Sequence, residues 1–134
     1  MDLNEKNDNG QMTMDNKEQI EACVQLYYEG CCESNAEKIK QAFDDNAMIS
    51  GYLPDGLHEM TLDDFASFVA AQQPSPKEKG DDEFLEIISC EVIGETASVQ
   101  IREAYLGMIF IDSFSFLKKE NIWRIYTKLF HVES

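Results

Sequence analysis

A change in the spacing of apolar residues constrains the fold of this sequence more than any other feature. Between Lys17 and about residue 70, most apolar residues recur every three or four positions, as they do along one face of an α-helix. From Phe84 onward they alternate with polar residues, which is the period of a half-buried β-strand. Helices followed by consecutive strands predict an α+β domain, in which three N-terminal helices pack on a curved antiparallel sheet.

Local signals place the predicted elements along the chain. A first helix begins at Lys17, and a second spans about residues 35–43, followed by a short strand at 47–52. Thr61 is a good N-cap for the third helix, because its side chain can accept a hydrogen bond from a free amide of the first turn. Pro74 and Pro76 end that helix. Four strands are expected afterwards, at 84–93, 96–105, 109–118 and 122–132.

Length and composition indicate one folded domain with a polar extension. The chain has 134 residues, of which 43% are hydrophobic and 10% aromatic, as in globular proteins. Residues 1–16 are rich in Asn and Asp and show no periodicity, so a disordered tail is expected there. Residues 17–134 are expected to form a single domain.

Charge and cysteine content exclude several classes of partner. A net charge of −15 disfavours nucleic acids and anionic membrane surfaces, which need clustered Lys and Arg. There is no secretory signal and no apolar run of the roughly 20 residues that span a membrane, so a cytoplasmic location is expected. The four cysteines lack metal-ligand spacing, so neither a metal nor a cofactor is predicted. A redox role for the adjacent Cys31 and Cys32 is left open.

The turns between the last three strands predict which side chains share a face. Two-residue turns at 106–107 and 120–121 bring the apolar residues of neighbouring strands together, which supports this register. The polar exceptions on that apolar face gather near one end of the sheet: Glu103, Tyr105, Asp112, Thr127 and His131. An apolar face with a few convergent polar groups is typical of a ligand cleft.

Asp112 and His131 are the candidate catalytic pair in this cleft. Asp112 lies among apolar residues, so desolvation should raise its pKa, and His131 is its diagonal neighbour. In the simpler alternative, both are solvated at the edge of the sheet. The candidate ligand-binding residues are Tyr27, Tyr105, Phe110, Phe114, Thr127 and Trp123, although Trp123 also suits a structural role. His58 is expected on a surface loop.

The opposite face of the sheet carries more apolar residues than a solvated face should. Ile111, Tyr126 and Phe130 are among them, mixed with Ser, Arg and Lys. This mixture predicts a homodimer through the outer face of the sheet.

Several short motifs resemble a known family when they are taken together. Order and spacing are similar to the putative lumazine-binding group of the nuclear transport factor 2-like superfamily, near the SnoaL-like and ketosteroid-isomerase-like proteins. The resemblance covers residues 17–133 and implies a cone of helices over a curved sheet. Isomerases of this superfamily use a Tyr and acidic groups in the cone, and Tyr27 and Asp112 correspond to them by position only. The motifs are Tyr27-Tyr28-Glu29-Gly30, Phe43-Asp44-Asp45-Asn46-Ala47, Thr61-Leu62-Asp63-Asp64-Phe65, Phe114-Ser115-Phe116-Leu117 with Trp123-Arg124-Ile125, and Lys128-Leu129-Phe130-His131.

Three functions are compatible with these observations. The first is a small-molecule-binding domain with an apolar cone pocket for an unknown apolar or aromatic ligand. The second is a cofactor-free isomerase or cyclase in which Asp112 transfers a proton. The third is a dimeric assembly module whose cone is filled by side chains. A buried Asp112 facing an open cavity would favour the enzyme, and an open cavity with a salt-bridged Asp112 would favour binding.

Overall fold

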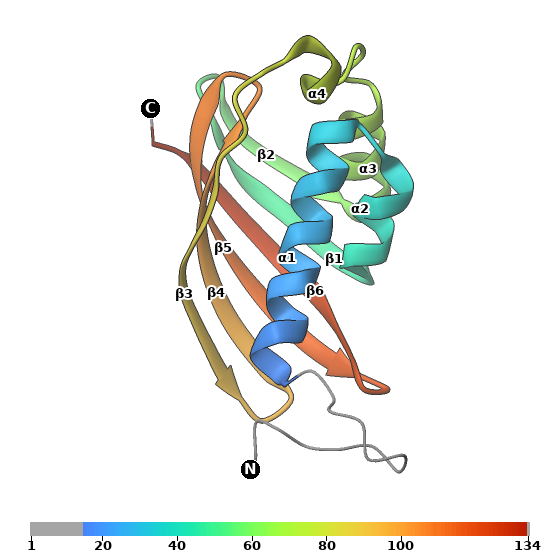
Figure 1. The fold of residues 1–134 in the computed structure, drawn as a ribbon, viewed down its shortest axis with the longest axis vertical. Coiled ribbons are helices and arrows are strands. Elements are labelled where there is room, and N and C mark those ends of the chain that lie inside the picture. The colour runs from blue at the N-terminus through green and yellow to red at the C-terminus, as the bar shows by residue number, and fades with distance from the viewer. Residues whose placement is uncertain (1–14, 134) are drawn as a thin grey trace.

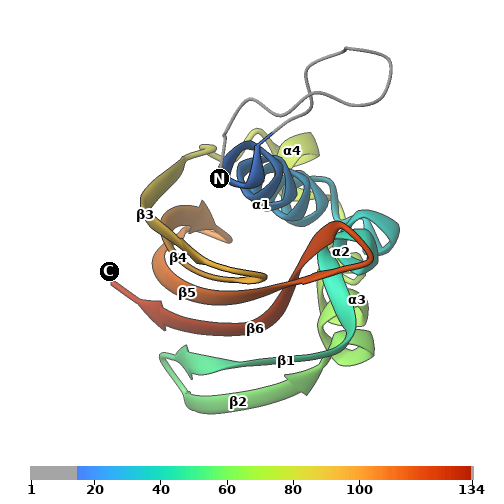
Figure 2. The same cartoon turned by 90° about the horizontal axis from the view of Figure 1, so that it is seen from below.

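The computed structural model describes residues 15–133, which form helices on one face of a six-stranded sheet (Figure 1). The sheet curves around the longest helix, and the helices leave its other face uncovered (Figure 2). The elements are α1 (Asn16–Glu33), α2 (Ala36–Ala42), β1 (Phe43–Leu53), β2 (Gly56–Thr61), α3 (Leu62–Ala70), α4 (Pro76–Lys79), β3 (Leu85–Ile93), β4 (Thr96–Tyr105), β5 (Met108–Lys119) and β6 (Ile122–Val132).

The first helix begins at Asn16, one residue earlier than a disordered tail at 1–16 would allow. Asp15 is the N-cap of α1, and its carboxylate accepts a hydrogen bond from the Glu18 amide while Glu18 bonds back to the Asp15 amide. This reciprocal pair satisfies two amides that the first turn leaves free. Residues 1–14 lie outside the described residues, so the rest of that expectation stays a prediction.

The sheet has the strand order β2-β1-β6-β5-β4-β3 and is mixed rather than antiparallel throughout. The strands β1 and β6 pair in parallel, while the other four pairings are antiparallel. The expected all-antiparallel sheet is therefore wrong at one pairing. Six other helices and strands lie between β1 and β6 along the chain, so no local turn signal could report this long-range parallel pairing.

Residues 56–61, expected as a loop and a cap, form the strand β2. Gly56 adopts φ +126, a conformation that side chains disfavour, and reverses the chain so that β2 pairs with β1. The alternating burial along β2 turns His58 and Met60 toward the helices and Leu57 toward solvent. The short helix α4 likewise replaces part of a loop expected after Pro74.

The hairpin between β4 and β5 has the predicted register. Leu106 and Gly107 both have positive φ, at 52 and 77, so the turn is the two-residue type that suits twisted strands. The pairs Glu103–Phe110, Ile101–Asp112 and Val99–Phe114 are those expected from the sequence.

The hairpin between β5 and β6 keeps the predicted register only as far as Ile125. Its turn at Glu120 and Asn121 is also of the two-residue type, and Phe116 pairs with Ile125 as expected. Ser115, however, pairs with Thr127, so Tyr126 is an extra residue that forms a β-bulge. Because side chains alternate along a strand, this single insertion exchanges the two faces for the remainder of β6.

Candidate ligand-binding site

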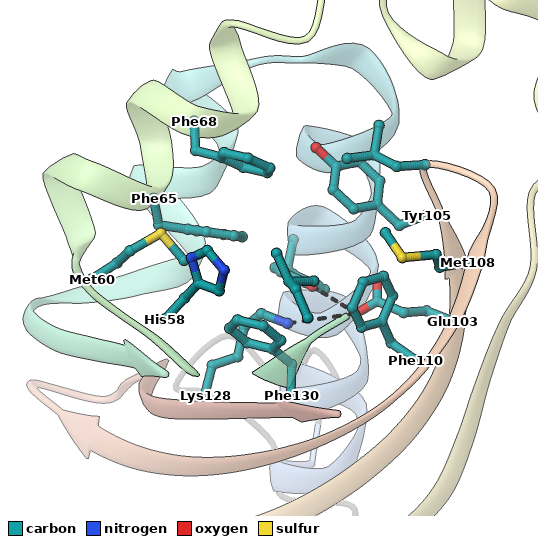
Figure 3. A pocket seen from close by; sticks show the side chains of 13 residues that line it. His58, Met60, Phe65, Phe68, Glu103, Tyr105, Met108, Phe110, Lys128 and Phe130 are labelled. Carbon is teal, nitrogen blue, oxygen red and sulfur yellow. Dashed lines mark hydrogen bonds and ion pairs between the residues drawn. The ribbon is translucent and has the colours of Figure 1, made fainter. Parts of the chain in front are cut away.

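A cavity of about 200 Å³ lies between the helices and the curved sheet, toward the end that holds the β4–β5 turn. Figure 3 shows aromatic and aliphatic side chains converging on it from α3, β2, β4, β5 and β6. The residues that line it are Tyr27, Leu53, His58, Met60, Phe65, Phe68, Glu103, Tyr105, Leu106, Met108, Phe110, Lys128 and Phe130. The wall is thus almost entirely apolar, with a few polar groups.

The start of α3 positions one wall of the cavity. Thr61 caps this helix by accepting a hydrogen bond from the Asp64 amide at 3.2 Å, and Asp64 bonds back to the Thr61 amide. This capping box fixes the angle between β2 and α3. As a result, Met60 at the end of β2 and Phe65 and Phe68 on α3 all face the cavity (Figure 3).

Four polar side chains form a buried network at the floor of the cavity. Lys128 Nζ lies 3.0 Å from Asp112 Oδ2 and 3.7 Å from Glu103 Oε2. The Tyr27 hydroxyl donates a hydrogen bond of 2.7 Å to Glu103 Oε2. The exposed fractions of Lys128, Asp112 and Glu103 are only 4%, 0% and 1%. We call these three ionisable residues the buried triad.

Aromatic rings surround the ammonium of the buried triad. Lys128 Nζ lies 5.1 to 5.8 Å from the ring centroids of Tyr27, Phe65, Phe114 and Phe130. These distances allow cation–π attraction, which compensates part of the desolvation of the ammonium. Lys128 is thus held by two carboxylates on one side and by π-systems on the others.

Burial also changes the titration of the groups around the cavity. Loss of solvent raises the pKa of Asp112 above its ordinary value, and the nearby Lys128 only partly opposes this. Desolvation raises the pKa of the Tyr27 and Tyr105 hydroxyls well above the usual range. Both tyrosines are therefore neutral hydrogen-bond donors at physiological pH.

Two polar atoms at the cavity wall have no hydrogen-bond partner among residues 15–133. They are the Tyr105 hydroxyl and Glu103 Oε1, and both are inaccessible to solvent. Buried polar groups without partners are rare, because each loses its hydrogen bonds to water on folding. A guest that reaches these atoms would supply the hydrogen bonds that they lack.

The structure brings some of the predicted site residues together at this cavity. Tyr27, Tyr105 and Phe110 line it, and Phe114 packs directly behind them against the Tyr27 ring, at 5.3 Å between centroids. Asp112 is buried as expected, but it lies behind Lys128 and is not part of the lining. The predicted pairing of Asp112 with His131 does not occur.

The bulge at Tyr126 places two predicted residues on the wrong face. Thr127 lies on the outer face, where its hydroxyl shares a hydrogen bond with Ser115. His131 is also on the outer face and is exposed. Neither can reach the cavity, so the structure does not bring them together with Tyr27, Tyr105 and Phe110.

Trp123 lies at the other end of the sheet and takes no part in the cavity. Its indole nitrogen donates a hydrogen bond of 3.1 Å to Asn16 at the start of α1. It is 4% exposed and pairs with Lys118 beside the β5–β6 turn. These contacts favour the structural role, and the structure does not bring Trp123 together with the cavity residues.

Sequence reasoning missed Lys128 and His58. With the unbulged register, Lys128 belongs to the outer face, and a Lys among Thr127 and Leu129 gives no signal of burial. His58 lies at the cavity wall, and its Nε2 is 2.7 Å from Asp55 Oδ1. The missed signal for His58 is the alternation of Leu57, His58, Glu59 and Met60, which has the period of a strand.

No metal site is formed by the described residues. Over residues 15–133, no group of three or more His, Cys, Asp or Glu side chains is arranged to hold a metal ion. Within the same range, no helix combines the length and apolar character needed to cross a membrane.

A family model described as "Putative lumazine-binding" matches residues 15–131 of the chain. The chain belongs to this family. The match covers the helices, the sheet and all 13 residues that line the cavity. The cavity of this lumazine-binding-family member is thus built wholly within the family's shared region. No curated protein matches the sequence.

Several solved structures have a fold similar to that of this chain. A nuclear transport factor 2-like protein of unknown function from Silicibacter pomeroyi has a TM-score of 0.78 at 23% identity, over 87% of this chain and 95% of that one. A second, from Shewanella baltica, has a TM-score of 0.77 at 24% identity, over 88% and 94%. A ketosteroid isomerase-like protein from Erwinia carotovora atroseptica has a TM-score of 0.65 at 15% identity, over 87% and 95%. At these identities the likeness shows the fold alone.

Proposed function

We propose that this protein binds a small, largely apolar molecule in the cavity between its helices and sheet. The observation that carries the proposal is an unfilled, apolar cavity of about 200 Å³ with unpartnered polar atoms at its wall. Phe65, Phe110 and Phe130 offer flat surfaces to an aromatic guest (Figure 3). The Tyr105 hydroxyl and Glu103 Oε1 would orient the polar edge of that guest.

The size of the cavity limits the guest to one or two rings. An engineered apolar cavity of about 150 Å³ in another protein accepts benzene. The cavity here is somewhat larger, and its polar atoms distinguish it from a packing defect, which is lined by apolar groups alone. The family name suggests lumazine, a fused two-ring heterocycle with N–H donors and carbonyl acceptors, as the first compound to test.

The geometry favours binding over the other two functions. Asp112 is paired with Lys128 and is not in the cavity lining, so it is badly placed to exchange a proton with a guest. An assembly module would have a filled cone, whereas this cone holds a cavity. Binding needs only the cavity and its polar groups.

A pair of substitutions on β2 tests the proposal. Met60 faces the cavity, and Leu57, three residues away, faces solvent with an exposed fraction of 53%. Met60→Trp should fill the cavity and abolish binding, while Leu57→Trp adds the same side chain on the other face and should leave binding unchanged. Isothermal titration of lumazine and of simple one- and two-ring aromatic compounds provides the measurement.

The proposal requires that at least one such compound binds the wild type and Leu57→Trp and fails to bind Met60→Trp. Binding that survives in Met60→Trp would place the site elsewhere and overturn the proposal. The absence of binding by every compound tested would also overturn it.

We also propose that two copies associate through the outer face of the sheet. Four large apolar side chains there are about half exposed: Met48 at 48%, Tyr52 at 55%, Leu57 at 53% and Leu129 at 58%. Strand pairing makes them neighbours, because Tyr52 lies opposite Leu57 and β1 lies beside β6. Phe130, expected on this face, is instead inside the cavity, so Leu129 replaces it in the proposed interface.

We propose further that the protein works in a reducing compartment such as the cytoplasm. Cys23, Cys31, Cys32 and Cys90 are all free thiols, and the first three are buried. Burial raises the pKa of Cys31 to about 12, so this thiol is unreactive at physiological pH. Fractionation of the native cells with an antibody against the protein tests this location.

A further inference from the structure

We propose that the cavity selects a small apolar cation, such as an aromatic amine or a protonated nitrogen heterocycle, with the Glu103 carboxylate as its anchor. This inference rests on the proposed function, because it assigns a chemical class to the guest of the same cavity. It is carried by the charge count of the buried triad and by the free oxygen of Glu103.

The buried triad contains two acids and a single base. Asp112 lies 3.0 Å from the Lys128 ammonium, whereas Glu103 lies 3.7 Å from it, so Asp112 is the closer counter-ion. The two acids share this one ammonium, so the triad carries one negative charge in excess when both of them are ionised. Glu103 lines the cavity and Asp112 does not, so Glu103 is the acid that a guest can meet.

The free oxygen of Glu103 supplies the hydrogen-bond geometry. Its Oε2 already accepts from the Tyr27 hydroxyl at 2.7 Å, while Oε1 has no partner among the described residues. Glu103 is only 1% exposed, so bulk solvent screens the charge of this carboxylate weakly. A charged N–H group is the donor that a buried carboxylate binds most strongly.

The surroundings also favour a positive guest. Tyr27, Phe65 and Phe130 already lie around the ammonium of Lys128, which is itself part of the cavity lining. The rings of Phe68 and Phe110 line the cavity without contacting that ammonium, and such surfaces attract organic cations. The net charge of −15 raises the local concentration of cations near the molecule. An anionic guest would have to take Lys128 from Asp112, leaving that carboxylate without a partner.

Without a guest, a proton bound to the buried triad would balance its second negative charge. The titratable groups that face the buried triad come from every element packed around it: Tyr27 and Cys31 on α1, His58 on β2, Tyr105 on β4, Asp112 on β5 and Lys128 on β6. Among these, burial raises the pKa of Asp112, which makes it the natural holder of the proton. A cationic guest would supply the positive charge in place of this proton. Binding of the guest should therefore release the proton to solvent.

Three naphthalene derivatives of nearly equal shape test the inference. They are 2-naphthylmethylamine, which is cationic, 2-naphthalenemethanol, which is neutral, and 2-naphthoate, which is anionic. The amine should bind the wild type about tenfold more tightly than the alcohol, as expected of a charge-assisted hydrogen bond, and naphthoate should bind most weakly. Glu103→Gln keeps the shape of the side chain and should remove the preference for the amine.

Control measurements separate this anchor from the general effect of negative charge. Glu59→Gln removes one negative charge from β2 on the outer face and should keep the preference for the amine. Titrations of the wild type in two buffers of different ionisation enthalpy should show proton release with the amine and none with the alcohol. This second measurement keeps the inference testable if Glu103→Gln does not fold.

The possible results distinguish a failure of the cation inference from a failure of the proposed function. Equal binding of amine and alcohol by the wild type would overturn the cation inference and leave the proposed function standing. A preference for the amine that persists in a folded Glu103→Gln, or the absence of proton release, would also overturn the inference. Failure of all three compounds to bind would overturn the proposed function with it.

Discussion

Replacement of Lys128 by Met removes the single positive charge of the buried triad and keeps a side chain of similar length. Asp112 and Glu103 then remain in the interior without a counter-ion. The fold can accommodate them only by protonating both carboxyls, whereas the wild type needs one proton to make the triad neutral. The loss of stability in the variant therefore measures the free energy that is needed to protonate one more carboxyl.

The magnitude follows from ordinary carboxyl chemistry. Protonating a carboxyl whose pKa is near 4 costs about 4 kcal/mol at pH 7, at about 1.4 kcal/mol for each pH unit. This agrees with the loss of about 3–5 kcal/mol that follows removal of one partner from a buried ion pair. In the folded variant both carboxyl pKa values lie above their unfolded values. The extra loss is therefore greatest at high pH and disappears as the pH falls toward 4.

Urea unfolding at several pH values measures this loss. Trp123 is the single tryptophan, is 4% exposed and lies away from the cavity, so its fluorescence reports unfolding without direct influence from the triad. Lys128→Met should lose about 4 kcal/mol at pH 7 and about 1–2 kcal/mol at pH 5. Lys119→Met, which removes an exposed Lys paired with Asp44, should lose at most about 1 kcal/mol.

Removal of one acid from the buried triad should change the stability of the protein little. Asp112→Asn leaves Lys128 and Glu103 as a balanced pair, so the free energy of unfolding should stay within about 1 kcal/mol of the wild type. The charge-count reasoning would be refuted if Asp112→Asn lost as much stability as Lys128→Met. A loss in Lys128→Met that is the same at pH 5 and pH 7 would refute it as well.

Three further predictions concern other parts of the fold. Tyr52→Glu combined with Leu129→Glu should give a folded monomer in sedimentation analysis, and a monomeric wild type would contradict the proposed interface. Trp123→Ala should lose about 3–5 kcal/mol in urea unfolding, since it removes a buried aromatic ring and its bond to Asn16; a loss below about 1 kcal/mol would contradict its structural role. Gly51→Ala should lose about 1–3 kcal/mol, because a Cβ there would clash with the carbonyl oxygen and the ring of Phe130. Ser50→Ala is the control for Gly51→Ala, and equal stability of the two variants would contradict the close packing at Gly51.

Much of the fold could be predicted because it depends on local signals. The cap at Thr61, the two-residue turns at 106–107 and 120–121, and the alternation along β4 and β5 all act within a few residues of the chain. The parallel pairing of β1 with β6 has no such signal, since the two strands are far apart in sequence. The pairing of β1 with β6 depends instead on how the whole sheet assembles.

The site could be predicted only in part, for a different physical reason. Tyr27, Tyr105 and Phe110 were placed correctly because they lie on α1 or before the bulge. Thr127 and His131 were placed incorrectly because the inserted residue exchanges the faces after it. Neither Tyr126 nor its neighbours have a residue type that distinguishes a bulge from a regular strand, so the pattern alone could not reveal it.

The bulge also explains how a strand with an ordinary surface pattern supplies the floor of a cavity. Without the extra Tyr126, the inward residues of β6 would be Thr127, Leu129 and His131, and Lys128 would lie in solvent. With it, Lys128 meets Asp112 and Glu103, and the Phe130 ring enters the space left by the missing side chain of Gly51. The desolvation of Lys128 is tolerable only because two carboxylates and four rings surround it. The bulge, Gly51 and the buried triad therefore depend on one another, because the bulge turns both Lys128 and Phe130 inward and Gly51 leaves room for the Phe130 ring.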